Sequence, residues 1–271
     1  VIRPFLRTTL GEDPLDLTRL MPPDVVKFVT SLQDRYAASS ITQTSTALRS
    51  LFRFLRMKGY CDEKLELSVP PVARWGLASL PCCLDEQQLK QVLEGFDRST
   101  PCGQRDLAMV LCLSTLGLRP RELAELRLED IDWRVGTLRL STRKTRRGAV
   151  LPLPREAGEA LVTYLQKGRP ETTERRVFVQ HGKRRPGTAI SAPAITAAVI
   201  RAIRRAGVDS PLGGAYVFRH TVAGRLVKRG APLKEVADFL GHQSLDTTTI
   251  YAKLDLSALQ DVALPWPEVS P

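Results

Sequence analysis

The feature that most constrains the fold is that only one short region has the alternating pattern of β-strands. "TLRLST" (137–142) sets Leu138 and Leu140 between polar neighbours, "RKTRRG" (143–148) follows as a basic turn, and "AVLPLP" (149–154) returns. This pattern predicts a β-hairpin with positive charge at its tip. Elsewhere the apolar residues recur at helical spacing. We therefore expect a mainly α-helical protein with a small antiparallel sheet.

The charge of the chain indicates what kind of partner it has. Its 271 residues include 40 Lys plus Arg against 29 Asp plus Glu, a formal net charge of +11. Such an excess favours a polyanion, because each neutralised phosphate releases condensed counterions. The alternative is a merely soluble basic protein. The length is sufficient for two domains.

Residues 1–72 predict an all-helical domain. Pro22 and Pro23 open a helix through "DVVKFVTSLQDRY" (24–36), and Gly59 ends a second one over "TQTSTALRSLFRFLRMKGY" (42–60). An apolar stripe on the second helix consists of Leu48, Leu51, Phe52 and Leu55. Its other face carries Arg49, Arg53 and Arg56. This face is either simply solvated or a candidate to lie along a DNA backbone.

A proline-rich break separates this region from the rest. "LSVPPVARWGLASLP" (67–81) interrupts the helical periodicity, and we expect a linker over 73–84 and a second domain over 85–271. In that domain Asp85 is expected to cap one helix, Gly117 to end a buried one, and Pro120 to open the next. Four further helical stretches are expected at about 155–167, 192–206, 218–229 and 233–240.

The cysteines and the hydropathy pattern suggest a cellular location. None of the five cysteines forms a CxxC pair, and with only three histidines a zinc site is not expected. The thiols are expected to be reduced. No apolar run approaches the roughly 18 to 20 residues that span a membrane, and no signal peptide opens the chain. These observations predict a cytoplasmic protein without contact to a membrane.

Polar residues that local structure does not explain occur in four separate segments. Arg119 lies in "GLRPREL", with Glu122 three residues on, and Lys144 lies at the hairpin tip. The remaining residues lie in the C-terminal part: Tyr216, Arg219, His220, His242 and Tyr251, the last nine residues after His242. Taken singly, each has an ordinary structural explanation, but their order and spacing together are specific.

The order resembles the tyrosine recombinase (phage integrase) family, whose pattern is Arg, Lys, His-x-x-Arg, His and Tyr. The boxes are "GLRPREL", "RKTRRGAVLPL" and "YVFRHTVAGRLVKRGAPLKEVADFLGHQSLDTTTIYAKL", within about residues 85–262. The resemblance implies a helical core-binding (SAM-like) domain followed by an α+β catalytic domain. It also implies a site-specific DNA recombinase or integrase that uses no cofactor, metal or ATP. The partners would be double-stranded DNA recombination sites and other recombinase protomers, the same or different, in a tetrameric synapse.

The resemblance also implies roles for individual residues. Tyr251 would be the nucleophile that forms a 3′-phosphotyrosyl bond, and Arg119 and Arg219 would clamp the phosphate through forked donors. Lys144 would be the general acid and His242 a donor to a nonbridging oxygen. Glu122 would orient an arginine. Other basic residues of the hairpin could substitute for the lysine or bind the DNA backbone: Arg143, Arg146 and Arg147.

One position departs from the family pattern. Where the His-x-x-Arg box has histidine, this chain has Tyr216. We expect Tyr216 to belong to the catalytic site, where it can donate a hydrogen bond to a phosphate oxygen or to the nucleophile. Its ordinary pKa near 10 makes it a poor base at neutral pH, so the departure affects the role of proton acceptor that the resemblance implies for this position. His220 follows Arg219 directly, but neighbouring helical positions point in different directions, so we expect that it cannot simply replace the missing ring. Two alternatives stay open. One is a non-catalytic DNA-binding relative that has lost turnover because of Tyr216, and the other is a type IB topoisomerase-like relaxing enzyme, which shares the chemistry but needs no partner site.

The C-terminal segment is expected to form a tail. "DLSALQDVALPWPEV" (255–269) carries Leu256, Leu259 and Val262 at helical spacing. We expect this tail to pack on a neighbouring protomer, as the family's assembly implies. The alternative is that it folds back on its own domain.

Overall fold

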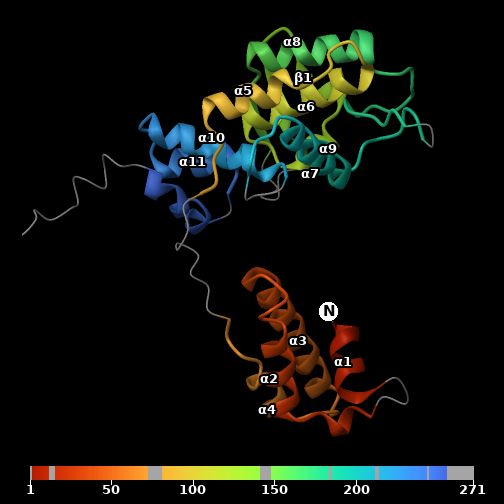
Figure 1. Ribbon diagram of the computed structural model, residues 1–271, viewed down its shortest axis with the longest axis vertical. Coiled ribbons are helices and arrows are strands. Elements are labelled where there is room, and N and C mark those ends of the chain that lie inside the picture. Colours follow the sequence, from red (N-terminus) through yellow and green to blue (C-terminus); the bar gives the residue numbers. More distant parts are fainter. Residues whose placement is uncertain are drawn as a thin grey trace, which may run out of the picture. The chain divides into compact units, whose positions relative to one another are not determined.

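The computed structural model divides the chain into two compact units, 1–78 and 79–271 (Figure 1). It describes residues 2–11, 16–72, 81–140, 148–182, 185–210, 214–242 and 244–254. The division lies inside the range 73–84 that the prolines predict to be a linker. Each unit is described by itself below.

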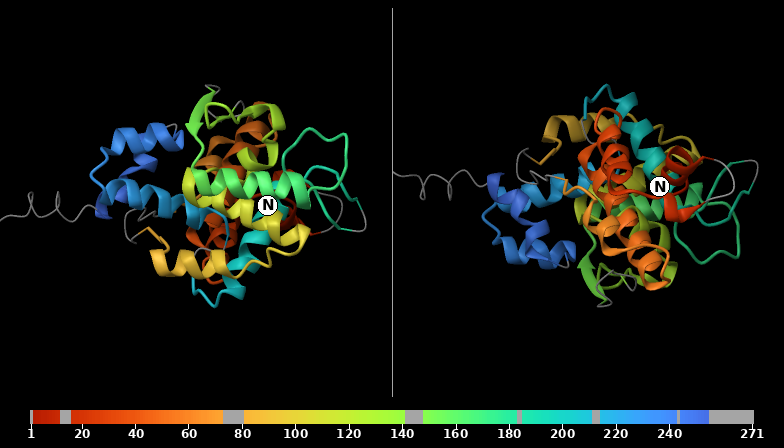
Figure 2. Two further views of the ribbon diagram at one scale, coloured as in Figure 1. Left: turned by 90° about the horizontal axis from the view of Figure 1, so that it is seen from above. Right: turned by 90° about the horizontal axis from the view of Figure 1, so that it is seen from below.

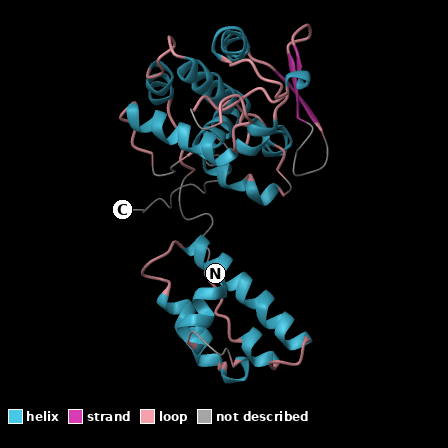
Figure 3. Ribbon diagram, turned by 90° about the vertical axis from the view of Figure 1, so that its right-hand side faces the viewer, coloured by secondary structure: helices cyan, strands magenta, loops and turns pink. Residues whose placement is uncertain are grey.

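The first unit is built of helices throughout its described residues (Figure 3). They are α1 (Ile2–Leu10), α2 (Pro22–Ser31), α3 (Ala38–Met57) and α4 (Glu63–Leu67), with a 3-10 turn over Leu17–Arg19. Phe5 lies at the centre of the core, with its ring 5.1 Å from that of Phe28 and 5.8 Å from that of Phe52. Leu48 and Leu55 are buried beside them, as the apolar stripe predicts.

The second unit surrounds the buried helix α6 (Figure 1). Along α6, Met109, Cys112 and Leu113 are fully buried, and both α8 and α10 pack against this helix. The helices of the unit are α5 (Glu86–Glu94), α6 (Pro101–Leu116), α7 (Pro120–Glu125), α8 (Arg155–Thr163), α9 (Ala192–Arg205), α10 (Tyr216–Lys228) and α11 (Leu233–Leu240). None of the helices in the described ranges is long and apolar enough to cross a membrane.

The helix ends follow the local signals in the sequence. Asp85 caps α5 by accepting a hydrogen bond from the Gln88 backbone N–H at 2.7 Å. Gly117 ends α6 in the left-handed conformation, with φ of 62°. Pro120 is the first residue of α7, as expected, and a 3-10 turn over Leu128–Asp130 follows this helix.

A three-stranded antiparallel sheet lies at one edge of the second unit (Figure 3). Its strands are β1 (Ile131–Asp132), β2 (Thr137–Leu140) and β3 (Ala149–Pro152), in that order. Leu138 pairs with Leu151 in the predicted hairpin, and both side chains are buried. The sequence pattern did not indicate β1, because a two-residue strand is too short to show alternation.

The C-terminal helices gather at one end of the second unit, away from the segment around residues 170–190 (Figure 2). After α11, a 3-10 turn over Leu245–Thr247 begins after its cap Ser244, and a second 3-10 segment covers Thr249–Leu254. The residues of the expected tail, 255–271, lie outside the described residues. A small apolar cluster joins these elements: Val222, Ala223, Val227, Val236, Leu240 and Tyr251.

Candidate active site

The first part of the candidate site is the turn between α6 and α7. A Cβ on Gly117 would come within 2.7 Å of the Leu240 side chain, so a glycine lets α6 end close to α11. Arg119 caps α7 and donates from Nη1 to Glu122 Oε1 at 2.7 Å, and from Nη2 to the Gly241 carbonyl at 2.9 Å. Glu122 is buried and also accepts the Arg119 backbone N–H at 2.8 Å. Glu122 and Gly241 therefore fix the direction of the Arg119 guanidinium.

The second arginine approaches the same turn from α10. Arg219 is buried and donates from Nη1 to the Gly117 carbonyl at 2.7 Å and from Nη2 to the Leu240 carbonyl at 2.5 Å. These carbonyls lie at the C-terminal ends of α6 and α11, where helix dipoles stabilise a cation. The two arginines thus contact adjacent residues, Leu240 and Gly241, from different elements.

His242 directly follows Gly241, the residue that ends α11. Gly241, with φ of 64°, ends α11, and the His242 backbone N–H donates to the Ala237 carbonyl at 2.9 Å. His242 Nδ1 lies 2.6 Å from Oγ1 of the fully buried Thr248. Burial, together with the charges of Arg219 and Arg119, lowers the pKa of His242 to about 4. The ring is therefore neutral near pH 7, and if Thr248 donates to Nδ1, the ring hydrogen is on Nε2.

Tyr251 lies beside α10 in the second 3-10 segment, with 2% of its surface exposed. Its hydroxyl oxygen is 2.8 Å from His220 Nδ1, and the ring centroids are 5.5 Å apart. Burial raises the pKa of Tyr251 to about 12, although the charge of Arg219 opposes this shift. Burial and the same arginine lower the pKa of His220. Both partners are therefore neutral near pH 7.

The His220 ring points toward the candidate nucleophile, which its place next to Arg219 on the helix did not lead us to expect. It contacts the Tyr251 hydroxyl, while its role in place of the missing histidine is not tested by this contact. Adjacent residues of a helix do point in different directions, but the segment that carries Tyr251 packs on the side of α10 toward which His220 points. Tyr216, the first residue of α10, is 55% exposed, and its hydroxyl takes no part in the hydrogen bonds that join the described site residues.

Two residues of this cluster did not emerge from the sequence as members of the site. For His220, the signal in the sequence is its place beside Arg219 on the same helix. Thr248 is the middle residue of the run "TTT" (247–249), and a threonine run alone does not reveal which hydroxyl is buried.

The basic residues of the hairpin tip cannot be placed against this cluster. Lys144 and its neighbours lie outside the described residues, which resume at 148. The assignment of Lys144 as general acid therefore stays a prediction. The same holds for three arginines that were expected to substitute for it or to bind DNA: Arg143, Arg146 and Arg147.

The arginines of α3 make contacts within the first unit. Arg49 donates to the Val69 carbonyl at 2.9 Å, and Arg53 donates from Nε and Nη2 to Glu66 Oε1 at 3.1 and 2.8 Å. Arg56 Nη1 lies 3.6 Å from Glu66 Oε2. Part of the positive charge on this face is therefore offset by α4. Its contact with a DNA backbone remains a prediction.

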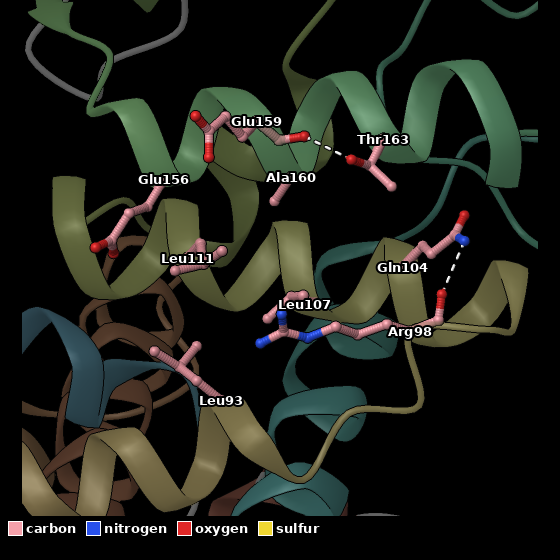
Figure 4. Close-up of a pocket in the computed structure, with 9 residues that line it drawn as sticks. All are labelled: Leu93, Arg98, Gln104, Leu107, Leu111, Glu156, Glu159, Ala160 and Thr163. Atoms are coloured by element: carbon pink, nitrogen blue, oxygen red, sulfur yellow. Dashed lines mark hydrogen bonds between the residues drawn. The ribbon is translucent and has the colours of Figure 1, made fainter.

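The cavity that lies between α5, α6 and α8 is separate from this cluster (Figure 4). It has a volume of about 360 Å³, and its wall combines apolar residues with charged ones. The residues that line it include Leu93, Arg98, Leu107, Glu156 and Glu159, and none of the candidate catalytic residues. Within the described ranges, no group of three His, Cys, Asp or Glu side chains is arranged to hold a metal ion.

Comparison with known proteins identifies the family. Residues 83–257 match the model of the phage integrase family. A Sinorhizobium fredii protein named as an integrase/recombinase, y4rA, is 39% identical over 268 residues, covering 98% of this chain and 64% of its own length. The tyrosine recombinase XerC of Oceanobacillus iheyensis is 32% identical over 245 residues, covering 88% of this chain and 78% of its own length.

The fold agrees with this result. The structure of the XerH site-specific recombinase bound to a palindromic difH substrate, in a post-cleavage complex, aligns with a TM-score of 0.77. The alignment covers 97% of this chain and 77% of XerH at 21% identity. The chain spans less than two thirds of the length of y4rA. The match over residues 83–257 and the similarity to XerC show that the chain belongs to the phage integrase family, the tyrosine recombinases.

Proposed function

We propose that this chain cuts and rejoins DNA strands at specific sites, with Tyr251 as the nucleophile. The observation that carries the proposal is that Arg119, Arg219, His242 and Tyr251 converge from separate segments around one turn. The charges of both arginines act on His242, and the charge of Arg219 also acts on Tyr251. Such a concentration of cations beside a buried phenol suits a phosphodiester as substrate.

The reaction is a transesterification in two steps. Tyr251 Oη attacks the phosphorus, the Oη–P bond forms, and the bond from phosphorus to the 5′-oxygen breaks. The product is a 3′-phosphotyrosyl link and a 5′-hydroxyl, whose proton comes from Lys144 in this proposal. A 5′-hydroxyl of another strand then reverses the step. Because the covalent link conserves the energy of the phosphodiester, the reaction needs no ATP.

Arg119, Arg219 and His242 stabilise the transition state, in which negative charge grows on the nonbridging oxygens. Arg119 and Arg219 carry permanent positive charge and need no proton transfer to act. Neutral His242, with Thr248 at Nδ1, would present its Nε2 hydrogen to the same phosphate. The fixed cations thus supply the charge neutralisation that a metal ion supplies in other phosphoryl-transfer sites.

The proposed partners are double-stranded DNA sites and further recombinase protomers in a tetrameric synapse. The net charge of +11 favours DNA, and XerH, which shares the fold, has been solved bound to its substrate DNA. The basic face of α3 and the hairpin tip are the proposed backbone contacts.

The test is covalent capture. The protein is incubated with a library of nicked duplexes of randomised sequence, and SDS-resistant protein–DNA adducts are isolated and sequenced. We expect adducts on a narrow set of sequences, with the DNA attached to residue 251 by peptide mapping. Binding without any adduct across the library would identify a non-catalytic relative instead. Strand exchange between two captured sites separates recombination from relaxation of supercoils.

A further inference from the structure

The departure at Tyr216 raises the question of which group receives the proton of the nucleophile. Resting on the function proposed above, we propose that His220 is a catalytic residue whose Nδ1 accepts the phenolic proton as Tyr251 attacks phosphorus. This assigns to His220 the role that the family pattern gives to the position of Tyr216.

The geometry of the pair meets the requirement for a proton acceptor. The 2.8 Å between His220 Nδ1 and Tyr251 Oη lies within the roughly 2.6 to 3.2 Å reach of a general base. With 2% of its surface exposed, Tyr251 has little access to bulk water, so a protein group is the natural acceptor. Tyr216 is 55% exposed and lies at the start of the helix.

The segment that precedes α5 forms hydrogen bonds with α10 at His220 and at the next residue, Thr221. The Cys83 thiol donates to the His220 carbonyl at 3.2 Å. The Thr221 hydroxyl accepts the Leu84 backbone N–H at 2.8 Å and donates to the Val217 carbonyl at 2.9 Å. These contacts fix the turn of α10 that carries the imidazole, so His220 is positioned before any substrate binds.

The charged and titratable groups around the ring favour an imidazole that is ready to accept. They are Arg219 on the same helix, His242 from the turn after α11, Tyr251 itself, and Cys83 from the segment before α5. Burial and Arg219 keep the pKa of His220 below its usual range, so Nδ1 is unprotonated near pH 7. A DNA phosphate at the two arginines would offset their charge and so ease protonation of the ring during the attack.

The proton released by Tyr251 has a defined acceptor in this proposal. The Oη–P bond forms as the Oη–H bond breaks, and the proton moves to Nδ1 to give an imidazolium. The departing 5′-oxygen takes a separate proton from Lys144, as proposed above. In the rejoining step the new 5′-hydroxyl gives its proton to the neutral Lys144 amine as its oxygen bonds to phosphorus, the P–Oη bond breaks, and the imidazolium returns its proton to Oη.

The chain provides a matched control for the test. His181 also pairs with a buried tyrosine, its Nε2 lying 3.2 Å from the Tyr164 hydroxyl oxygen, but outside the cluster of Arg119 and Arg219. The experiment compares His220→Asn with His181→Asn. Asparagine keeps a polar atom near the position of Nδ1 but cannot take up a proton. The measurements are single-turnover adduct formation on a captured nicked duplex at saturating protein, DNA affinity, and Tm.

We expect His220→Asn to form the Tyr251 adduct at least about 100-fold more slowly, the scale on which general bases act. Its DNA affinity should stay unchanged, and His181→Asn should cleave at the wild-type rate. The wild-type rate should fall on the acidic side of neutrality, as Nδ1 becomes protonated, and this fall should be absent in His220→Asn. If His220→Asn does not fold, His220→Gln and the wild-type pH profile provide the test.

Different results overturn the two proposals. A His220→Asn rate within about 3-fold of wild type, which corresponds to roughly 0.7 kcal/mol of activation free energy, rules out His220 as acceptor and leaves Tyr251 as nucleophile. A wild-type rate that does not depend on pH has the same consequence. An adduct that maps to another residue, or no adduct from wild type, overturns the proposed function and this inference with it.

Discussion

The second unit contains two histidine–tyrosine pairs that look alike locally. In one, Tyr251 Oη lies 2.8 Å from His220 Nδ1; in the other, Tyr164 Oη lies 3.2 Å from His181 Nε2. Both tyrosines are buried, and burial raises the pKa of each to about 12. Burial and a shifted pKa therefore do not by themselves distinguish a nucleophile from a core residue.

The difference lies in the charges around each pair. Near Tyr164, the Arg105 guanidinium is paired with Asp106 at 2.7 Å, and the Tyr164 ring stacks on Phe178. Beside Tyr251, Arg219 donates to the Gly117 and Leu240 carbonyls, and its charge acts on Tyr251, His220 and His242. We therefore expect the arginines that surround each pair, and not burial, to distinguish the pair that acts on a phosphate.

The largest contrast is expected from removing each tyrosine hydroxyl in turn. Tyr251→Phe should abolish the covalent adduct while leaving DNA affinity nearly intact, since only the nucleophilic oxygen is lost. Tyr164→Phe should keep adduct formation and change mainly Tm, since it removes a hydrogen bond of the core. SDS gels and binding titrations provide both readouts. An adduct in Tyr251→Phe would contradict the assignment.

The next contrast concerns the arginines beside each pair. Arg119→Ala and Arg219→Ala should each slow cleavage by at least about 100-fold, the scale for losing one preorganised donor to a developing oxyanion. Arg105→Ala should lower Tm, because Asp106 loses its partner, while the folded protein cleaves normally. Single-turnover rates at saturating protein separate these effects from binding. Equal slowing by all three substitutions would remove the distinction between the two regions.

A smaller effect is expected at the exposed start of α10. Tyr216→Phe should slow cleavage by no more than about 10-fold, which corresponds to about 1.4 kcal/mol of activation free energy. The reason is that the exposed Tyr216 hydroxyl makes none of the hydrogen bonds that join the described site residues. Tyr216→His should be tolerated. Peptide mapping should find no DNA on residue 216. Complete inactivity of Tyr216→Phe would instead assign the proton transfer to that residue.

The smallest contrast is in stability at acid pH. The folded pKa of His242, about 4, lies below the ordinary value near 6.5, so between these values the unfolded chain binds more protons and stability falls as pH falls. Allowing for partial exposure, we expect a loss of about 1 kcal/mol between pH 7 and pH 5. Urea unfolding at both pH values measures the loss of stability. We expect the loss to be smaller in His242→Gln than in wild type, and His181→Gln to lie between the two. An equal pH dependence of both variants would contradict the shift.

Features that depend on contacts within a few residues could be predicted from the sequence, and features that depend on contacts between distant segments could not. Asp85 and Gly117 mark helix ends through contacts within a few residues, so their positions were predictable. The contact between His220 and Tyr251 depends on where a C-terminal segment packs against α10, which helical periodicity does not encode. Likewise, the pairing of Arg53 with Glu66 depends on the packing of α4 against α3.

Gly224 lets two segments, one before α5 and one at the C-terminal end of the described residues, pack closely against α10. A Cβ there would lie 2.9 Å from the Leu254 side chain and 3.0 Å from the Cys83 thiol, so both segments rest on α10 at the same point, about one turn after Arg219 and His220. Cys83 lies near the end of the expected linker (73–84), and Leu254 directly precedes the C-terminal segment. We therefore expect a displacement of either segment to reach the helix that carries the site. We expect Gly224→Ala to loosen both anchors, which faster hydrogen exchange at Leu84 and Tyr251 would reveal, and unchanged exchange there would contradict this expectation.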